Sequence, residues 1–275
     1  MKALAQAGAL ARSKPLARLS VLGRLRSRGQ MGAWGGRPLL GALAAGLLAP
    51  AAVAHVTASE PGPQPAAPLR IGIIGAGHIG GTLAQLWVKA GHEVLLSSRH
   101  PARLQELARS LGPRAHLGTP REAAQFGDVV LVSVPYGALP QLGQDLRAEL
   151  AGKVVLDTCN PYPARDGPMA LEARAKGTGV ASAQFLPGAR LVRAFNAINA
   201  GDLRSEAHRS GEPIAIALAG DDPQALEVAQ RLVRDAGFEP VVVGPLARAR
   251  EFDVGTSVYT RLLTVPQLRQ ALGLK

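Results

Sequence analysis

The sequence predicts an α/β fold, a doubly wound and mostly parallel sheet in a single domain with a short C-terminal extension. Short apolar, β-branched runs recur through residues 70–275, and helix-length segments separate them, as in a sheet that is buried on both faces. A glycine-rich turn stands between the first of these runs and the segment that follows it. The hydrophobic fraction of 47% is enough for a sizeable core, and with only 4% aromatic residues this core must consist of Ala, Val, Leu and Ile.

The first apolar run, Leu69–Ile74, is expected to be a buried strand, and the glycine-rich turn follows it directly. The turn reads Gly75-Ala76-Gly77-His78-Ile79-Gly80, with glycines in the spacing G-x-G-x-x-G. The first glycine permits a tight turn, the second lets the backbone approach a pyrophosphate, and the third lets the helix pack closely on the strand. A helix is expected from about His78 to Ala90, and the N–H groups of its first turn would bind the pyrophosphate.

The later elements complete a Rossmann-type arrangement. Further strands are expected at His92–Leu96, Asp128–Pro135, Val154–Asp157, Leu191–Asn196, Pro213–Leu218 and Pro240–Val243, with a helix at Pro223–Ala236. In an open sheet of this kind, ligands bind at the carboxyl ends of the strands. About 30 residues follow Gly244, too few for the large helical domain that hydroxyacid dehydrogenases and pyrroline-carboxylate reductases add. The activity is therefore expected at the sheet edge and its loops.

The end of the second strand indicates NADP rather than NAD. In NAD-binding versions of this turn, a carboxylate about 20 residues further on binds the ribose 2′-hydroxyl. Here the strand ends in Ser98 and Arg99, without a carboxylate. A hydroxyl and a guanidinium suit a 2′-phosphate, which arginine can grip with two hydrogen bonds. Arg103, one turn into the next helix, is a second candidate for this contact.

The net charge of +11 does not indicate nucleic-acid binding, because of where the charges lie. Residues 1–59 hold eight of the 31 basic residues and no acidic one, whereas residues 60–275 hold 23 basic and 20 acidic residues. A nucleic-acid groove needs basic residues clustered on the folded domain itself. We therefore expect no nucleic-acid partner.

Residues 1–54 are predicted to be a basic leader of the signal-peptide type. An uncharged run, Pro38–Ala54, follows the basic region and ends in Ala52-Val53-Ala54, a small-residue cleavage pattern. The run is too short and too rich in Ala and Gly for a stable membrane span, so a periplasmic or secreted protein is expected. The alternatives are translation from Met31, with the upstream sequence never translated, an organellar transit peptide, or a disordered tail on a cytoplasmic protein. Residues 55–69 carry four prolines and are expected to be a linker to the NADP-binding domain, residues 70–275.

Residue types for metal or redox chemistry are sparse. Cys159 is the single cysteine, so no intrachain disulfide is possible, and the six histidines show no metal-ligand spacing. We expect no metal site, and we expect Cys159 to be a packing residue. The sequence offers no acid–base pair or catalytic triad, so no catalytic side chain is predicted.

Residues 70–250 resemble the coenzyme F420-dependent NADP oxidoreductase family and the related reductase domain of the STEAP metalloreductases. The matching segments are IGIIGAGHIGGTLA (71–84), GHEVLLSSR (91–99), DVVLVSVPY (128–136), LPGARLVRAFNAI (186–198) and VGPLARARE (243–251). The resemblance implies that a hydride moves between NADPH and a small-molecule acceptor, a deazaflavin such as F420 or a flavin such as FMN or FAD. Such a transfer depends on proximity, orientation and a dry pocket rather than on a nucleophilic side chain.

The resemblance also implies which residues form the site. The NADP phosphates would be held by Ala76, Gly77, His78, Ile79, Ser98, Arg99 and Arg103. The nicotinamide side would be lined by Ser133, Val134 and Pro135, and the acceptor site would be bounded by Asn160, Pro161, Asn196 and Ala197. Tyr136 and Tyr162 could each stack on a ring or merely cover one.

Two alternatives and one partner remain open. A non-catalytic NADP(H)-binding sensor or scaffold would share the nucleotide site but turn over no acceptor. An exported binding module with a decayed nucleotide site would not bind NADPH. A homodimer is plausible by resemblance alone.

Overall fold

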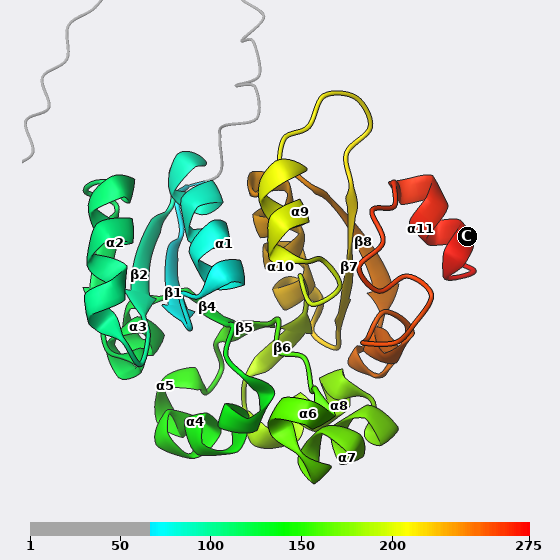
Figure 1. Cartoon of the computed structure of the whole chain (residues 1–275), viewed down its shortest axis with the longest axis horizontal. Coiled ribbons are helices and arrows are strands. Elements are labelled where there is room, and N and C mark those ends of the chain that lie inside the picture. Colours follow the sequence, from blue (N-terminus) through cyan, green and yellow to red (C-terminus); the bar gives the residue numbers. More distant parts are fainter. Residues whose placement is uncertain (1–66) are drawn as a thin grey trace, which may run out of the picture. The chain divides into compact units, whose positions relative to one another are not determined.

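The structure, a computed structural model, describes residues 67–275; the predicted leader and most of the predicted linker lie outside the described residues. One eight-stranded sheet runs through this part of the chain, in the order β3-β2-β1-β4-β5-β6-β7-β8 (Figure 1). The strands are β1 (Arg70–Ile74), β2 (Glu93–Ser97), β3 (Ala115–Gly118), β4 (Val129–Val132), β5 (Val154–Asp157), β6 (Arg190–Arg193), β7 (Ala215–Gly220) and β8 (Glu239–Gly244).

Strand direction divides the sheet in two. Strands β1 to β6 are parallel, whereas β7 is antiparallel to β6 and β8 is parallel to β7. The strand order reverses between β1 and β4: β2 and β3 follow on one side of this pair, and β5 and β6 on the other. Such a reversal is the switch point at which sheets of this kind bind nucleotides. The predicted doubly wound, mostly parallel fold is confirmed, and the order β3-β2-β1-β4-β5-β6 is that of a Rossmann-type sheet.

Three details differ from the sequence prediction. Strand β3 was not expected, because this short edge strand leaves His116 and Leu117 exposed and so lacks the buried apolar pattern. Strand β4 ends at Val132 and β6 at Arg193, each earlier than predicted. After β6 the chain turns sharply, with φ of +56° at Phe195.

The helices of the described residues cover both faces of the sheet (Figure 1). They are α1 (His78–Lys89), α2 (Gln105–Leu111), α3 (Pro120–Phe126), α4 (Leu139–Asp145), α5 (Arg147–Leu150), α6 (Pro163–Asp166), α7 (Pro168–Lys176), α8 (Thr178–Phe185), α9 (Ala200–Ser205), α10 (Pro223–Asp235) and α11 (Val265–Ala271), with 3₁₀ turns η1 (Pro101–Leu104), η2 (Tyr136–Ala138) and η3 (Leu246–Glu251). The helices predicted at His78–Ala90 and Pro223–Ala236 are present to within one residue. Among residues 67–275, no helix combines the length and the apolar character that a membrane crossing requires.

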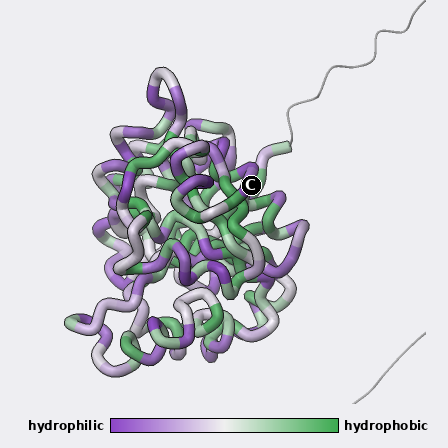
Figure 2. The backbone as a smooth tube through the Cα atoms, turned by 90° about the vertical axis from the view of Figure 1, so that its right-hand side faces the viewer, coloured by the Kyte–Doolittle hydropathy of each residue, from purple (hydrophilic) through white to green (hydrophobic). Residues whose placement is uncertain are grey.

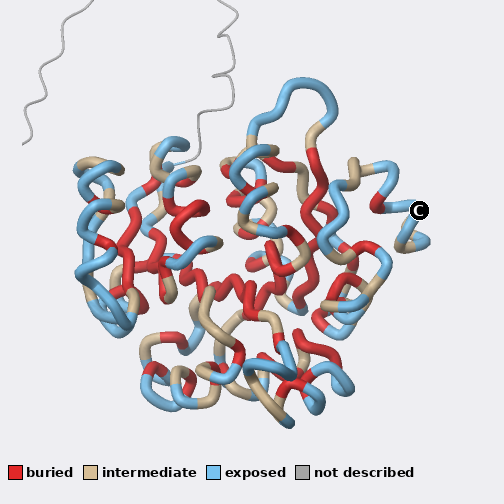
Figure 3. The backbone as a smooth tube through the Cα atoms, in the orientation of Figure 1, coloured by how far each residue is buried: buried red, intermediate tan, exposed pale blue. Residues whose placement is uncertain are grey.

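The core lies on both sides of the strands, which are the most buried part of the chain (Figure 3). Apolar segments run through the interior and polar ones over the outside (Figure 2). On one face α1, α2, α9 and α10 pack on the sheet around Trp87, whose indole N–H donates to the Leu232 carbonyl at 2.8 Å. On the other face, α3 to α5, α7 and α8 pack around Tyr136 and Leu139. This two-sided cover leaves the ends of the strands as the place for a site.

Candidate functional site

The glycine-rich turn is held by β2 and by the start of the loop after β4. The N–H groups of Gly75 and Ala76 both donate to the Ser97 carbonyl, at 3.1 and 3.0 Å. Gly75 has φ of +97°, and a Cβ there would lie 2.3 Å from the Ser133 carbonyl oxygen. A Cβ at Gly80 would lie 2.4 Å from the Gly75 carbonyl oxygen, whereas a Cβ at Gly77 would meet no atom within 4 Å. A side chain would therefore clash with the protein at the first and third glycines of the turn, whereas the space beside the second glycine is empty of protein atoms.

The N-terminus of α1 is available to an anion. Gly77 is the residue that precedes the helix, no side chain caps this end, and the first turn contains no carboxylate. The first N–H groups of a helix lack partners within the helix and carry a partial positive charge. The open side of Gly77 therefore faces a position suited to a pyrophosphate, and the residues present fit a dinucleotide.

A cleft of about 610 Å³ lies at the carboxyl ends of β1, β2, β3 and β4. This volume is within the usual range for ligand sites. Its lining residues come from the glycine turn, the end of β2, the start of α3 and the segment from β4 through α4: Ile74, Gly75, Gly77, Ser97, Ser98, Arg99, Thr119, Pro120, Arg121, Ser133, Val134, Pro135, Ala138, Gln141, Leu142, Asp145 and Leu146. Seven of the predicted cofactor residues share this cleft: Gly75, Gly77, Ser98, Arg99, Ser133, Val134 and Pro135.

The other residues predicted for the glycine turn and the phosphate contacts do not line the cleft. Ala76 and Gly80 are buried, His78 is exposed and Ile79 is half-buried at the start of α1. Arg103 is exposed on η1 and does not line the cleft. These residues shape the turn or lie beside it, while the cleft surface itself is formed by their neighbours.

Arg99 is the free cation at the β2 end of the cleft. It is exposed and has no hydrogen-bond or ion-pair partner among residues 67–275. Ser98 lines the cleft beside it, and its Oγ accepts a hydrogen bond from the His100 N–H at 3.2 Å. Asp145 is the one carboxylate among the cleft residues, and it lies at the end of α4. Because no carboxylate ends β2, this end of the cleft suits a phosphate better than a ribose hydroxyl.

The sequence prediction missed one wall of the cleft, Thr119–Arg121. Arg121 forms an ion pair with Glu149, and its Nη2 donates to the Asp145 carbonyl at 2.6 Å, which ties α3 to α4 and α5. The wall follows β3, so recognising that edge strand would have placed it at the same sheet edge. A second wall, also missed, runs from the end of η2 through α4 to Leu146 and is formed by Ala138, Gln141, Leu142, Asp145 and Leu146.

The four residues predicted to bound the acceptor site lie on the loops after β5 and β6. Asn160 Nδ2 donates to the Asn196 carbonyl at 2.8 Å, so these two loops are in contact. Pro161 and Asn196 are buried, Asn160 and Ala197 are half-buried, and none of the four lines the cleft. The structure therefore groups Asn160 with Asn196, apart from the nucleotide residues.

A fully buried arginine organises these loops. All five N–H donors of Arg193 are satisfied: Nε donates to Asp253, Nη1 donates to Asp157 and the Cys159 carbonyl, and Nη2 donates to Asn160 and Asp253, all within 3.2 Å. Burial alone would lower the pKa of this guanidinium, but the two aspartates hold it above its ordinary value. No sequence pattern predicts this role for Arg193, because an arginine at a strand end is usually exposed.

The lone cysteine lies within the same cluster. Cys159 is 2% exposed, and burial together with the nearby Asp157 carboxylate raises the pKa of its thiol well above the ordinary value. A thiol in such surroundings stays protonated and unreactive, as a packing residue does. Within residues 67–275, no group of three or more His, Cys, Asp or Glu side chains is arranged to hold a metal ion.

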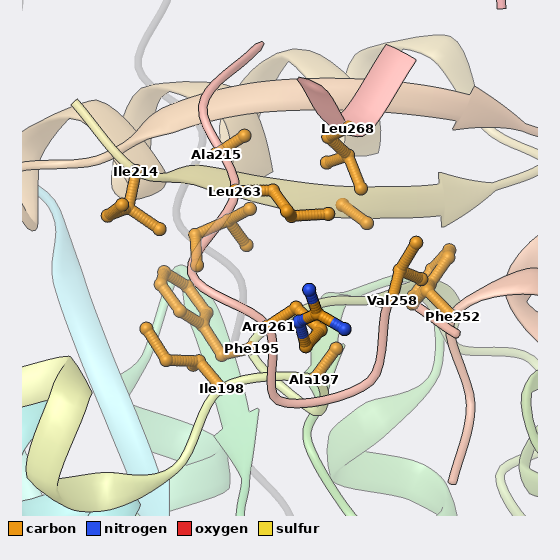
Figure 4. Close-up of a pocket in the computed structure, with 12 residues that line it drawn as sticks. Phe195, Ala197, Ile198, Ile214, Ala215, Phe252, Val258, Arg261, Leu263 and Leu268 are labelled. Carbon is orange, nitrogen blue, oxygen red and sulfur yellow. The ribbon is translucent and has the colours of Figure 1, made fainter. Parts of the chain in front are cut away.

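A second, small cavity lies between β7, the chain after β6 and the segment before α11 (Figure 4). Its volume is about 20 Å³, and its lining is apolar apart from Arg261. Figure 4 shows Ala197 at this cavity beside Phe195 and Ile198. The space holds about one water molecule, so it is no site for a ring.

The comparisons with known proteins agree with this geometry. The model of the family described as "NADP oxidoreductase coenzyme F420-dependent" matches residues 70–161, which run from β1 to just beyond β5. Rat metalloreductase STEAP3 is 32% identical over 211 residues, which are 74% of this chain and 40% of that protein. Mouse metalloreductase STEAP2 is 25% identical over 183 residues, 66% of this chain and 35% of that protein. The chain thus spans well under half of these relatives.

Two solved structures share the fold. A hypothetical protein from Sinorhizobium meliloti has a TM-score of 0.60 and 26% identity, covering 72% of this chain and 96% of the other. A putative F420-dependent NADP reductase from Arthrobacter sp. FB24 has a TM-score of 0.58 and 22% identity, covering 66% and 87%. The predicted resemblance is confirmed: residues 70–161 carry a domain of this oxidoreductase family, with distant similarity to the STEAP reductase domain.

Proposed function

We propose that this chain, with its family domain at residues 70–161, is an NADPH-dependent oxidoreductase that transfers a hydride between NADP(H) and a flavin or deazaflavin. The observation that carries the proposal is the cleft, with an open, uncapped helix start at Gly77 and with Arg99, which has no partner in the described part of the chain. The cleft joins an anion site for the pyrophosphate to a cation for the 2′-phosphate.

The chain's own residues have distinct tasks in this proposal. Gly77 and the first N–H groups of α1 bind the pyrophosphate, and Ser98 with Arg99 bind the 2′-phosphate. Ser133, Val134 and Pro135, which follow β4, flank the nicotinamide and exclude water from its face. A bound NADPH supplies the hydride, so that one NADPH, one proton and one oxidised acceptor give NADP⁺ and the acceptor reduced by two electrons. The protein contributes proximity and orientation.

A non-catalytic NADP(H)-binding protein is the second candidate. The lining after β4, Ser133–Pro135 and Ala138, carries no titratable side chain, which suits a binding protein as well as a hydride-transfer enzyme. The two candidates share the nucleotide site and differ in turnover alone.

One experiment separates them. The full chain is titrated with NADPH and with NADH while nicotinamide fluorescence is followed, and NADPH oxidation is then recorded at 340 nm with riboflavin, FMN, FAD or coenzyme F420. We expect tighter binding of NADPH than of NADH, and oxidation with at least one acceptor. Tight binding without oxidation by any of the four supports the sensor or scaffold, and the absence of any NADPH binding refutes both.

A further inference from the structure

The two tyrosines near the site have different surroundings. Tyr136 is 0% exposed and packs edge-on against Phe185, and burial raises the pKa of its hydroxyl to about 12. Tyr162 is 38% exposed, on the loop between β5 and α6. Tyr136 is thus a core residue, and Tyr162 is the one of the two that a ligand can reach.

Tyr162 is exposed but firmly held. Its hydroxyl is hydrogen-bonded to the Tyr259 hydroxyl at 2.5 Å, and its backbone N–H donates to Asp166 Oδ2 at 3.0 Å. The guanidinium of Arg165 lies over its ring, 5.2 Å from the ring centre. A rigid exposed aromatic ring loses little conformational entropy when it binds a partner, which is why such rings anchor binding surfaces.

Tyr259, which holds the ring, is itself anchored to the buried cluster. Asn160 Nδ2 donates to the Tyr259 hydroxyl at 3.2 Å, and Asn160 Oδ1 accepts from Arg193 at 2.8 Å. Burial and the hydrogen bond to Tyr162 raise the pKa of the Tyr259 hydroxyl, so this hydroxyl stays protonated. The position of the exposed ring is therefore fixed, through Asn160 and Tyr259, by a buried arginine at the end of β6.

The same loop is tied to the cofactor cleft by one carboxylate. Asp166 accepts the Tyr162 N–H with one oxygen and the Gly137 N–H with the other, at 3.0 and 3.1 Å. Gly137 stands between Pro135 and Ala138, and both of these residues line the cleft. Burial would raise the pKa of Asp166, but hydrogen bonds from Arg165 and the two N–H groups hold it below its ordinary value. This bridge stays charged at neutral pH.

We propose that Tyr162 is the residue on which the ring of the hydride acceptor stacks. The ligand class is a planar heteroaromatic, an isoalloxazine or its deaza analogue, placed beside the Pro135 end of the cleft. This assignment rests on the proposed function, since it names the acceptor side of that same site. Stacking of a flat ring on an immobilised aromatic adds affinity without requiring a charged or reactive side chain.

The test measures ring binding without turnover. The full chain, saturated with NADP⁺, is titrated with riboflavin and with 5-deazariboflavin, and flavin fluorescence is recorded. A phenol in contact with a flavin ring quenches its fluorescence by electron transfer, whereas a phenyl ring does not. We expect Tyr162→Ala to weaken binding about tenfold and Tyr162→Phe to keep affinity within about threefold but lose most of the quenching.

Two control variants complete the design. Leu171→Ala removes another exposed apolar side chain, 59% exposed on α7, and should change neither affinity nor quenching. Tyr259→Phe removes the hydroxyl that holds Tyr162 and should weaken ring binding less than Tyr162→Ala does. NADPH affinity should match the unmodified protein in all four variants. The melting temperature should match it in Leu171→Ala and fall slightly in the other three, which lose the hydrogen bond between Tyr162 and Tyr259.

The possible failures are distinguishable. If the unmodified protein binds NADPH but neither binds nor reduces any flavin or deazaflavin, the proposed function fails and this inference with it. If it binds and reduces riboflavin and Tyr162→Ala does so equally well, Tyr162 is not the stacking residue, while the proposed function stands. Should Tyr162→Ala fail to fold, Tyr162→Phe decides, because unchanged quenching in that variant means that the phenol does not touch the ring.

Discussion

A substitution at Gly77, the second glycine of the turn, is expected to change the affinity for NADPH while leaving the stability of the fold nearly unchanged. In Gly77→Ala the new methyl group meets no protein atom within 4 Å, but the ψ of −148° at this position lies outside the usual range for alanine. The backbone cost in the folded state opposes the loss of freedom in the unfolded chain, so the free energy of unfolding should change by less than about 1 kcal/mol. The methyl group would instead occupy the space through which the pyrophosphate reaches the helix start.

The magnitude for binding follows from that overlap. Forcing a methyl group into a close contact costs about 1–3 kcal/mol, which corresponds to a loss of about 5- to 150-fold in NADPH affinity. The loss should be the same for NADH, because both nucleotides share the pyrophosphate. The assay pairs a fluorescence titration of NADPH with urea unfolding of the same preparation.

Gly80→Ala is the matched control. Its methyl group would lie 2.4 Å from the Gly75 carbonyl oxygen, inside the protein. The clash should outweigh the gain of about 1 kcal/mol in helix propensity, so this variant loses stability and its melting temperature falls by several degrees, roughly 2–4 °C per kcal/mol. If Gly77→Ala bound NADPH as well as the unmodified protein does, the pyrophosphate would not lie at this turn, and the proposed nucleotide site would be wrong.

Four further outcomes are expected. Arg99→Ala should weaken NADPH binding about tenfold and leave NADH binding unchanged, since an exposed charged hydrogen bond is worth about 1.5 kcal/mol; equal losses in two parallel titrations would refute the 2′-phosphate contact. Arg193→Met should cost about 3–5 kcal/mol in urea unfolding, because it leaves buried carboxylates unpaired, whereas Arg190→Met on the same strand breaks a half-exposed pair and should cost under about 1 kcal/mol; similar costs would contradict the cluster's role. The hydrogen bond from Arg190 lowers the pKa of Asp222 to about 2 from 3.8, so its stabilising effect is full above pH 4 and disappears as the pH falls towards 2; Asp222→Asn should flatten this acid limb of the urea midpoint, and an unchanged slope would argue against it. We also propose export, so mass spectrometry of the mature protein should find His55 as its first residue; an intact leader would count against this.

The nucleotide half of the fold was predictable because its signals are local. The strand, the three glycines and the helix form one continuous segment, and the first and third glycines each have a steric reason in the structure. The edge strand β3 escaped prediction because its residues are half-exposed, and the cleft wall at Thr119–Arg121 was lost with it. Because β3 was not predicted, the cleft wall that follows it was not predicted either.

The loops after β5 and β6, which we propose as the acceptor side, were less predictable because their contacts are long-range. Arg193 meets Asp253, 60 residues later, and Asn160 meets Tyr259, 99 residues later. No local pattern reports such pairings. Tyr136 and Tyr162 likewise differ only in burial, which depends on where α8 and the C-terminal segment pack.

This difference between the two sides has a consequence for biosynthesis. Every strand that borders the cleft has been synthesised once residue 161 has been made, so this half can form while translation continues. The loops after β5 and β6 reach their final contacts later. Their partners Asp253 and Tyr259 are synthesised only after β7, which is antiparallel to β6, and β8. If the proposed function holds, substitutions near Asp253 and Tyr259 would alter the acceptor side while leaving the cleft formed by β1 to β4 unchanged.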